Sequence, residues 1–363
     1  MRLAILGTRG IPANYGGFET FAEELSVRLV ERGHHVTVYC RQRHTEREYR
    51  GVRLRYLPTI RHKYFDTIAH TALSTLDALF RRFDAVLYCN AANAVFTPWA
   101  RLLGTPTALN VDGLERHRKK WNRLAKLWYL LSEWLATFCC SAVVTDAATI
   151  RDYYLERFHK SSTFIPYGAE TGKVAGTDQL CALGLEPGKY VLYVSRLEPE
   201  NNALLVREAF EQVTTDLKLA IIGDAPYAEE YIRKVKNTSD PRIVIPGAVY
   251  GEGYHQLQSH AAVYVQATEV GGTHPALIEA LGRGALVLYL DTPEMAEAAG
   301  DAAVSFKPDA ADLARKLQWA VDLRESERAI WGRRAMERIE KHYSWKIITD
   351  SYESLFRNLV SPE

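Results

Sequence analysis

The stretch VGGTHPALIEAL, residues 270–281, places two adjacent glycines directly before an apolar helical pattern, and it follows the strand-like run AAVYVQ at 261–266. A strand, a glycine loop and a helix in this order turn backbone N–H groups at the helix start toward an anion. Glu279, two turns into the helix among apolar neighbours, could then reach ribose hydroxyls. The same pattern also fits a strand-to-helix turn without a ligand. The stretch therefore indicates parallel α/β structure with a candidate nucleotide site.

A second glycine-rich joint lies at the N-terminus. Residues 3–6 read as a buried strand, GTRGIPANYGG at 7–17 as a loop, and 18–32 as an amphipathic helix closed by Gly33. A dinucleotide-binding turn would need G-x-G-x-x-G and an acidic residue after the second strand. Here Gly7 and Gly10 are three apart, and the second strand ends in Arg41, which could meet the 2′-phosphate of NADP. The spacing disfavours a dehydrogenase.

Strand-like and helix-like segments alternate along the whole chain. The candidate strands are 3–6, 36–40, 54–57, 85–89, 107–111, 142–145, 163–166, 190–195, 219–222, 243–245, 262–266, 286–290 and 304–306. Such alternation is typical of parallel sheets covered by helices. A glycine-rich stretch at 167–189 separates two series of strands. We therefore predict an α/β fold of two facing, doubly wound Rossmann-like domains, 1–168 and 169–344, with ligands bound in a cleft between them.

Composition narrows the class of protein. A chain of 363 residues with 47% hydrophobic residues can build two cores. Its five cysteines, without metal-site spacing, argue against a disulfide scaffold or a zinc site and suit a reducing compartment. No secretory segment and no apolar run of roughly twenty residues is evident. We expect a cytoplasmic protein that needs no metal.

Positive charge is concentrated in the first half of the chain, where residues 1–170 carry 24 Lys plus Arg and 16 Asp plus Glu. Its densest segment, on a helix expected at about 117–138, contains Arg116, Arg118, Lys119, Lys120, Arg123, Lys126, Trp121, Trp128, Tyr129 and Trp134. Basic residues interleaved with tryptophans indicate a surface that lies on anionic lipid. A domain helix with core aromatics and solvated lysines fits equally well. Nucleic acid is a poorer fit, because no recognised binding module accompanies the segment.

Five segments together carry a family resemblance. They are GTRGIPANYGGFETFAEEL at 7–25, NVDGLE at 110–115, IPYGA at 165–169, SRLEPENN at 195–202 and the 270–281 stretch. In this order they resemble the rhamnosyltransferase-like branch of family-four glycosyltransferases. The resemblance implies a GT-B fold, a nucleotide-sugar donor on the C-terminal domain, an acceptor on the N-terminal domain, and transfer with retention by a hexosyltransferase-type enzyme (EC 2.4). It also implies that the last helix, 345–363, packs back on the first domain.

Donor-binding roles follow from the matching positions. Arg196 can present a fixed, charged fork to the diphosphate and stabilise the leaving group. Glu279 matches the second glutamate of the family's paired motif, which contacts ribose. The loop before it contributes backbone N–H groups, a hydroxyl and an imidazole that could touch the sugar, from Gly271, Gly272, Thr273 and His274. A histidine in such a loop is more often solvated or capping.

Two positions depart from the family pattern. The first glutamate of the pair should occupy position 271, which is a glycine, and Glu269 could replace it only in a rearranged loop. Asn201 stands where many relatives have a lysine that assists the arginine. The resemblance implies that similar substitutions occur in the rhamnosyltransferase-like branch. The alternative is a nucleotide-sugar-binding protein that has lost catalysis.

The first domain carries further catalytic and donor-binding candidates. Asp112 follows a strand and could stabilise positive charge near the anomeric carbon, although an Asp-Gly turn explains it locally. Gly16 and Gly17 would let the first helix start close to the donor phosphates. Glu19, in its first turn, favours the helix dipole and could accept a hydrogen bond from an acceptor hydroxyl.

The resemblance, together with the basic segment, implies a membrane-associated transferase of cell-surface glycan synthesis. It would move a sugar, plausibly L-rhamnose from dTDP-L-rhamnose, to a lipid-linked or polysaccharide acceptor. The expected partners are the nucleotide sugar, the acceptor and an anionic membrane at the inner face of the plasma membrane, with no nucleic acid and no cofactor. The proposed membrane or acceptor surface comprises Arg118, Lys119, Lys120, Trp121, Arg123 and Trp128.

Overall fold

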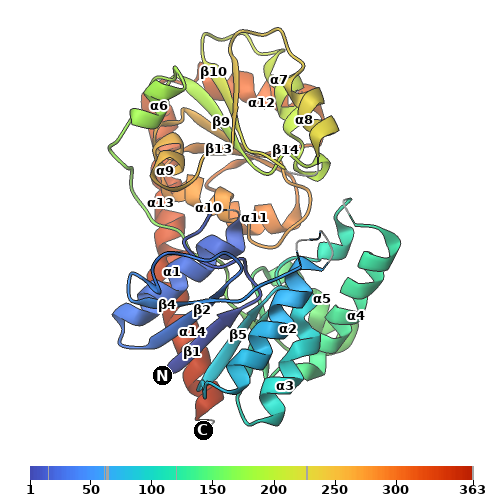
Figure 1. Ribbon diagram of the computed structural model, residues 1–363. Coiled ribbons are helices and arrows are strands. Elements are labelled where there is room, and N and C mark those ends of the chain that lie inside the picture. The colour runs from blue at the N-terminus through green and yellow to red at the C-terminus, as the bar shows by residue number, and fades with distance from the viewer. Residues whose placement is uncertain (15, 61, 63–64, 120, 226–227, 362–363) are drawn as a thin grey trace. The chain divides into compact units, whose positions relative to one another are not determined.

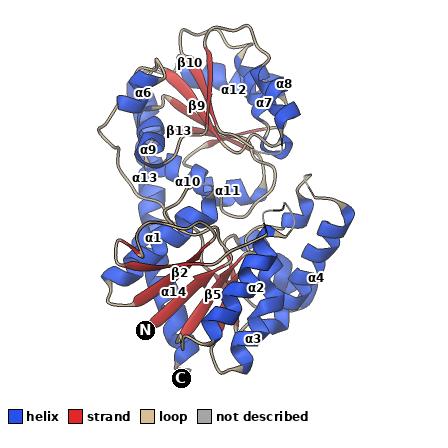
Figure 2. Cartoon of the chain, in the orientation of Figure 1, coloured by secondary structure: helices blue, strands red, loops and turns tan. Residues whose placement is uncertain are grey.

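The computed structural model describes residues 1–14, 16–60, 62, 65–119, 121–225 and 228–361 (Figure 1). The chain divides into two compact units, each built as one sheet flanked by helices (Figure 2). Unit 1 comprises Met1–Tyr167 and Trp345–Glu363, and unit 2 comprises Gly168–Ser344. The chain leaves unit 1 after Tyr167, one residue before the boundary that we placed at 168.

The sheet of unit 1 has the strand order β3-β4-β2-β1-β5-β6-β7-β8. Its strands are β1 (Arg2–Leu6), β2 (His35–Cys40), β3 (Glu48–Tyr49), β4 (Val52–Tyr56), β5 (Ala85–Cys89), β6 (Thr107–Asn110), β7 (Ala142–Thr145) and β8 (Thr163–Phe164). Every pairing is parallel except that of β3 with β4. The central strands are almost wholly buried because helices cover both faces of the sheet.

The helices of unit 1 are α1 (Gly17–Glu31), α2 (Asp66–Leu79), α3 (Thr97–Leu102), α4 (Arg123–Cys139), α5 (Ala148–Phe158) and α14 (Trp345–Val360), with 3-10 turns η1 (Ala91–Phe96) and η2 (Glu115–His117). From β1 the chain runs outward to β2, and from β5 it runs the other way to β8. Right-handed crossovers therefore put α1 on one face of the sheet and the helices that follow β5 on the other.

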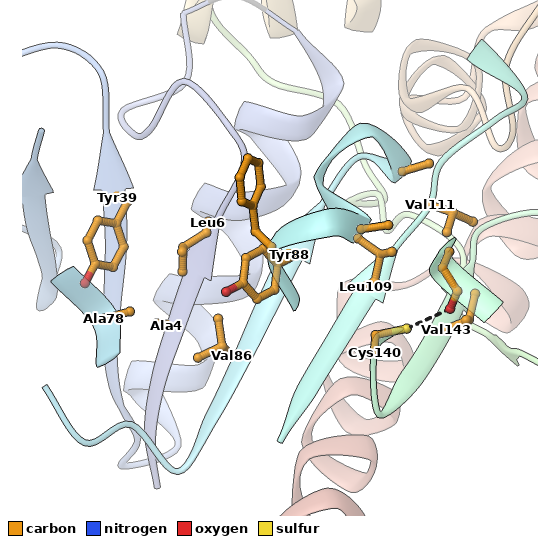
Figure 3. Close-up of a cluster of buried hydrophobic side chains, with 14 of the residues drawn as sticks. Ala4, Leu6, Tyr39, Ala78, Val86, Tyr88, Leu109, Val111, Cys140 and Val143 are labelled. Carbon is orange, nitrogen blue, oxygen red and sulfur yellow. Dashed lines mark hydrogen bonds between the residues drawn. The ribbon is translucent and has the colours of Figure 1, made fainter. Parts of the chain in front are cut away.

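The core of unit 1 lies under this second helix layer (Figure 3). Leu6, Tyr88 and Leu109 from three neighbouring strands are fully buried there beside Ala136 and Cys140 at the end of α4. The Cys140 thiol donates to the Ala136 carbonyl at 3.2 Å. The described cysteines are all free, and only Cys181 is exposed.

The sheet of unit 2 is parallel throughout, in the order β11-β10-β9-β12-β13-β14. Its strands are β9 (Tyr190–Val194), β10 (Lys218–Ile222), β11 (Ile243–Gly247), β12 (Val263–Gln266), β13 (Leu286–Leu290) and β14 (Val304–Phe306). Its helices are α6 (Asp178–Ala182), α7 (Ala203–Phe210), α8 (Glu229–Lys236), α9 (Gly251–His260), α10 (Pro275–Gly282), α11 (Pro293–Ala299), α12 (Ala310–Asp322) and α13 (Glu325–His342), with a 3-10 turn η3 (Pro199–Asn201).

The C-terminal helix α14 belongs to unit 1 and packs against α1. Glu353 accepts from Arg32 at 2.8 Å, and its other oxygen lies 3.2 Å from the ring of His34. The ring of Tyr352 lies 5.3 Å from that of Phe21. Salt bridges and ring contacts thus hold the end of the chain to its beginning.

The structure differs from the sequence expectations at three elements. The helix expected at 117–138 begins at Arg123, because Asn122 caps it by accepting from the Ala125 N–H. Residues 312–341 read in the sequence as one continuous helix, whereas the structure has two helices, α12 and α13, separated at Leu323 and Arg324. The short antiparallel β3 was not expected. No helix in the described part of the chain is long and apolar enough to cross a membrane.

Candidate functional site

The strand order of unit 2 reverses between β9 and β12. The chain runs from β9 toward β11 on one side and from β12 toward β14 on the other. Open α/β sheets bind ligands outside the carboxyl ends of the strands at such a point. The loops that follow β9 and β12 carry Arg196 and residues 271–274. These predicted donor residues are therefore placed at one edge of the sheet of unit 2.

Hydrogen bonds join these two loops. The side-chain amide of Asn202 donates to the Ala267 carbonyl at 2.9 Å and to Oε1 of Glu269 at 3.1 Å. The N–H of Glu269 donates to the Glu200 carbonyl at 2.9 Å. The Glu269 carboxylate is thus engaged with the first loop, and the structure shows no rearranged loop in which it replaces the glutamate absent at 271.

Arg196 is half-buried on the first loop, with its guanidinium 3.8 Å from the carboxylate of Glu198. Asn201 is buried beneath it and donates to the Arg196 carbonyl at 2.7 Å. The Tyr193 hydroxyl donates to the Asn201 carbonyl at 2.6 Å. Asn201 therefore braces the backbone of Arg196, a role that differs from the phosphate contact of the lysine it replaces.

Gly271 and His274 form one structural feature. A Cβ atom added at Gly271 would lie 2.5 Å from Cε1 and about 3 Å from both ring nitrogens of His274. The imidazole thus occupies the space that any side chain at 271 would need. Gly272 and Thr273 are buried between them, and Pro275 begins α10. The absence of the first glutamate is therefore coupled to the placement of this imidazole.

Glu279 is held by a neighbouring helix. Its Oε2 accepts from the Tyr254 hydroxyl at 2.5 Å, and Gln258 donates to the same hydroxyl oxygen at 2.7 Å. Burial, together with the adjacent Glu279, raises the pKa of Tyr254 well above its usual value, so this hydroxyl stays protonated and donates. Sequence reasoning missed Tyr254 and Gln258. Their spacing of four residues places them on one face of a helix, but many residue pairs share this spacing, so it does not identify a site.

The N-terminal loop of unit 1 is tied to α1 by two carboxylates. Glu19 accepts from the Arg9 N–H at 2.9 Å, and Glu23 accepts from the Ala13 N–H at 2.6 Å. Burial raises the pKa of Glu19, partly offset by the Arg9 hydrogen bond and by Arg41. Gly16 caps α1 with extended backbone, and Gly17 is the first helical residue. Glu19 is thus chiefly an internal anchor of the loop after β1.

Asp112 follows β6 with a left-handed backbone, at φ +58°. Its N–H donates to Oδ1 of Asn110 at 3.0 Å, and the Asn110 amide donates to the Tyr352 hydroxyl at 3.0 Å. The Tyr167 hydroxyl lies 3.5 Å from Oδ1 of Asp112. Non-glycine residues in this conformation concentrate at functional sites when their surroundings hold them there. Asn110 and Tyr352, which sequence reasoning missed, supply that support from β6 and α14.

Arg41 is engaged within unit 1. It donates to Asp66 at 2.8 Å and to the Thr67 hydroxyl at 3.1 Å, and its side chain is almost wholly buried. The structure thus assigns its charge to an internal ion pair. Arg41 is therefore not positioned as a free ligand for the 2′-phosphate of NADP.

Two arginines of the basic segment, Arg116 and Arg118, are paired internally, and the surface expectation is wrong for Arg118. Arg118 is buried and donates to Glu115 at 2.5 Å, and the Trp121 ring N–H donates to the same carboxylate at 3.2 Å. Arg116 is paired in the same way with the buried Glu133, at 2.7 Å. A buried charge is tolerated when it is paired, and the carboxylates of Glu115 and Glu133 pair with Arg118 and Arg116. Lys119 and Arg123 are exposed, Trp121 and Trp128 are half-buried, and Lys120 lies outside the described residues.

Within the described ranges, no group of three or more His, Cys, Asp or Glu side chains is arranged to hold a metal ion.

Two family models match successive parts of the chain. Residues 15–173 match Glycosyltransferase Family 4, and residues 188–322 match Glycosyl transferases group 1. Each match falls largely within one sheet-containing unit of the structure. No curated protein matches the chain in sequence.

Solved structures share the whole architecture at low sequence identity. A sucrose-phosphate synthase from Thermosynechococcus elongatus is 18% identical with a TM-score of 0.79, covering 99% of this chain and 98% of that one. Anabaena HepE in complex with UDP-glucose is 14% identical at 0.79, covering 98% and 99%. WaaG, a glycosyltransferase involved in lipopolysaccharide biosynthesis, is 15% identical at 0.75, covering both chains completely.

The fold is that of the GT-B glycosyltransferases, with two domains each built on a largely parallel sheet, as predicted. The chain joins a Glycosyltransferase Family 4 domain to a Glycosyl transferases group 1 domain and is a hexosyltransferase-type enzyme.

Proposed function

We propose that this enzyme transfers L-rhamnose from dTDP-L-rhamnose, with retention at the anomeric carbon, to a lipid-linked or polysaccharide acceptor in cell-surface glycan synthesis. The observation that carries the proposal is the arrangement at the carboxyl edge of the sheet of unit 2. There Arg196 and Glu279, a diphosphate ligand and a ribose ligand in the family pattern, are each braced by a hydrogen bond, from the buried Asn201 and from the half-buried Tyr254.

The donor chemistry follows from these two side chains. Cleavage of the sugar–phosphate bond leaves negative charge on the diphosphate, and a guanidinium fork stabilises that charge more as it develops. Glu279 accepts hydrogen bonds from ribose hydroxyls and fixes the nucleotide, while Tyr254 fixes Glu279. Gly271, Gly272 and Thr273 supply backbone N–H groups beside the donor.

The choice of sugar draws support from Gly271 and His274. An imidazole has fewer hydrogen-bond acceptor sites than the carboxylate of the family pattern, so the loop offers fewer acceptors to the sugar. L-Rhamnose, a 6-deoxy sugar, presents one hydroxyl fewer than glucose. Solved structures of the same fold contain UDP or UDP-glucose, whereas the proposed donor contains dTDP. The identity of the nucleotide base therefore needs a direct test.

Unit 1 supplies the acceptor side of the reaction. The Asp112 carboxylate would orient the sugar or stabilise the oxocarbenium-like charge of the retaining transition state. Glu19 accepts from the Arg9 N–H through Oε1, and its second carboxylate oxygen would accept a hydrogen bond from an acceptor hydroxyl. We propose that no metal or cofactor takes part, so a chelator should leave the rate unchanged.

The test is a donor panel. Purified protein is incubated with dTDP-rhamnose, UDP-glucose, UDP-N-acetylglucosamine or GDP-mannose and a lipid-diphosphate sugar acceptor, and both nucleoside-diphosphate release and glycosylated product are measured. Matched release and product from dTDP-rhamnose alone support the proposal. Product from another donor would overturn the choice of sugar and leave the transferase.

A nucleotide-sugar-binding protein without catalysis is the second candidate. Gly271 and Asn201 favour it, because each removes a donor contact of the family pattern. Tight binding of a nucleoside diphosphate, with neither release nor product across a range of acceptors, would support it.

We further propose that the protein is cytoplasmic and makes peripheral contact with the anionic inner face of the plasma membrane, where a lipid-linked acceptor would be found. Its described helices include none that could cross the membrane, and Lys119 and Arg123 are exposed for such contact.

A further inference from the structure

One face of α4 is apolar and exposed to solvent. Leu124, Leu127, Leu131, Trp134 and Phe138 recur every three or four residues and are each 43% to 77% exposed. This spacing puts them in one row along the helix, about 21 Å long at a rise of ~1.5 Å per residue. The opposite side, with Tyr129, Ala136 and Cys139, packs into the core of unit 1.

The row continues onto the end of α3. Arg101 donates to the carbonyls of Phe138 and Cys139 at 2.8 and 2.9 Å, which joins the last turns of the two helices. Leu102 and Leu103, next in the chain, are 83% and 65% exposed. We call these seven side chains the apolar row. Contiguous apolar surface of this kind marks an interaction site on a water-soluble domain.

The exposed charge on α3, α4 and the chain between them is of one sign. Arg101, Lys119, Arg123 and Lys126 are exposed. The described acidic residues of this segment, 97–139, are Asp112, Glu115 and Glu133, and none is exposed, whereas the neighbouring α5 carries the exposed Asp152 and Glu156. An apolar helix face bordered by cations and without exposed carboxylates complements an anionic lipid surface.

A second copy of the chain fits less well. The spacing of three and four resembles a coiled-coil seam, whose partners are chosen by opposite charges at the flanking positions. On α4 these positions are Arg123, Trp128, Leu130, Leu135 and Thr137, which offer no carboxylate to pair with Arg123. Two copies would therefore gain no ion pair at these positions.

We propose that the apolar row inserts into an anionic bilayer, with Arg123 and Lys126 on the phosphate headgroups. This inference deepens the peripheral contact of the proposed function by assigning it to α3 and α4 rather than to the buried Arg118. The apolar side chains, and not the basic segment alone, would then determine the strength of binding.

The experiment measures sedimentation of the purified full chain with phosphatidylglycerol vesicles and with phosphatidylcholine vesicles. The test variant is Leu127→Ser/Leu131→Ser/Trp134→Ser. The control is Ile330→Ser/Trp319→Ser, two apolar side chains of unit 2 that are 44% and 37% exposed. The unmodified protein and the control should bind phosphatidylglycerol more tightly than phosphatidylcholine, and the test variant at least tenfold more weakly than both.

A second variant, Arg123→Gln/Lys126→Gln, should weaken binding to phosphatidylglycerol and reduce its dependence on salt. Turnover of a water-soluble acceptor should be unchanged in the test variant, so lost docking is distinguished from lost transfer. Full binding by the test variant, or no binding by the unmodified protein, would overturn the proposal. So would a dimer that the test variant converts to a monomer, because a second copy would then cover the row.

Discussion

Arg196 is held at its backbone and at its side chain. Asn201 donates to its carbonyl, and the carboxylate of Glu198 lies 3.8 Å from its guanidinium. We expect Arg196→Ala to weaken binding of dTDP by about 10- to 150-fold, or ~1.5–3 kcal/mol, the range for hydrogen bonds to charged groups. Calorimetric titration with dTDP measures it. Unchanged affinity would show that another cation holds the diphosphate.

Tyr254 acts on the donor only through Glu279. Tyr254→Phe removes the hydroxyl that donates to Glu279 and leaves the ring, so the carboxylate loses its fixed orientation. We expect about a fivefold loss of dTDP affinity, ~1 kcal/mol, with the free nucleoside affected equally because the contact is to ribose. The exposed Tyr250, at the start of the same helix, provides the control Tyr250→Phe. An equal loss in both variants would argue against a positioning role for Tyr254.

Gly271 is explained by a contact and not by its backbone angle. Gly271→Ala would place a Cβ 2.5 Å from the His274 ring and displace the imidazole. We expect kcat/KM for the sugar donor to fall at least tenfold, with thermal stability changed by less than ~1 kcal/mol. In a double-mutant cycle, Gly271→Ala should add little to His274→Ala if both act through the imidazole. Additive losses would separate the two residues.

At the scale of elements, α14 is fastened to α1 by charge. Hydrogen bonds from Arg357 and Arg32 to Glu353 lower the pKa of Glu353 to about 2, despite partial burial. A carboxyl whose pKa is lower in the folded than in the unfolded protein stabilises the fold above its unfolded pKa, near 4.5. That contribution is lost as the pH falls toward 2.

Thermal unfolding of Glu353→Gln tests this attachment. At pH 7 the variant should melt below the unmodified protein, and the difference should shrink as the pH falls from about 5 to 2. A difference that is independent of pH would assign the effect to packing of α14 and not to the ion pairs.

The secondary-structure elements also show how much of the fold could be predicted from the sequence. Strands such as β5 and β13 were predicted to the residue, because each is an uninterrupted apolar run that ends at a polar residue, Asn90 or Asp291. The two-residue β3 has no such run. The start of α4 was predicted too early, because the basic residues before it are also common in helices. In the structure the Asn122 side chain caps the helix, which fixes its first residue as Arg123.

At the scale of the whole molecule, the proposed donor ligands Arg196 and Glu279 are carried by unit 2, and the proposed catalytic Asp112 is carried by unit 1. We expect Asp112→Asn to reduce kcat by on the order of 10²-fold, since the charge is lost while asparagine still tolerates the left-handed backbone. Its affinity for dTDP should be unchanged. Full activity of Asp112→Asn would leave Asp112 as an Asp-Gly turn only, and a large loss of dTDP affinity would place it on the donor.

The sequence by itself determined the alternation of strands and helices, the glycine-rich joints and the positions of Arg196, Glu279 and Asp112. These are local patterns, and hydrophobic periodicity and turn chemistry act over a few residues. Only the tertiary structure determined which side chains hydrogen-bond to these residues. Tyr254 reaches Glu279 across 25 residues, and Tyr352 reaches Asn110 across 242. It also buried Arg118 and exposed Leu124, because whether a side chain is covered depends on which other elements pack against it.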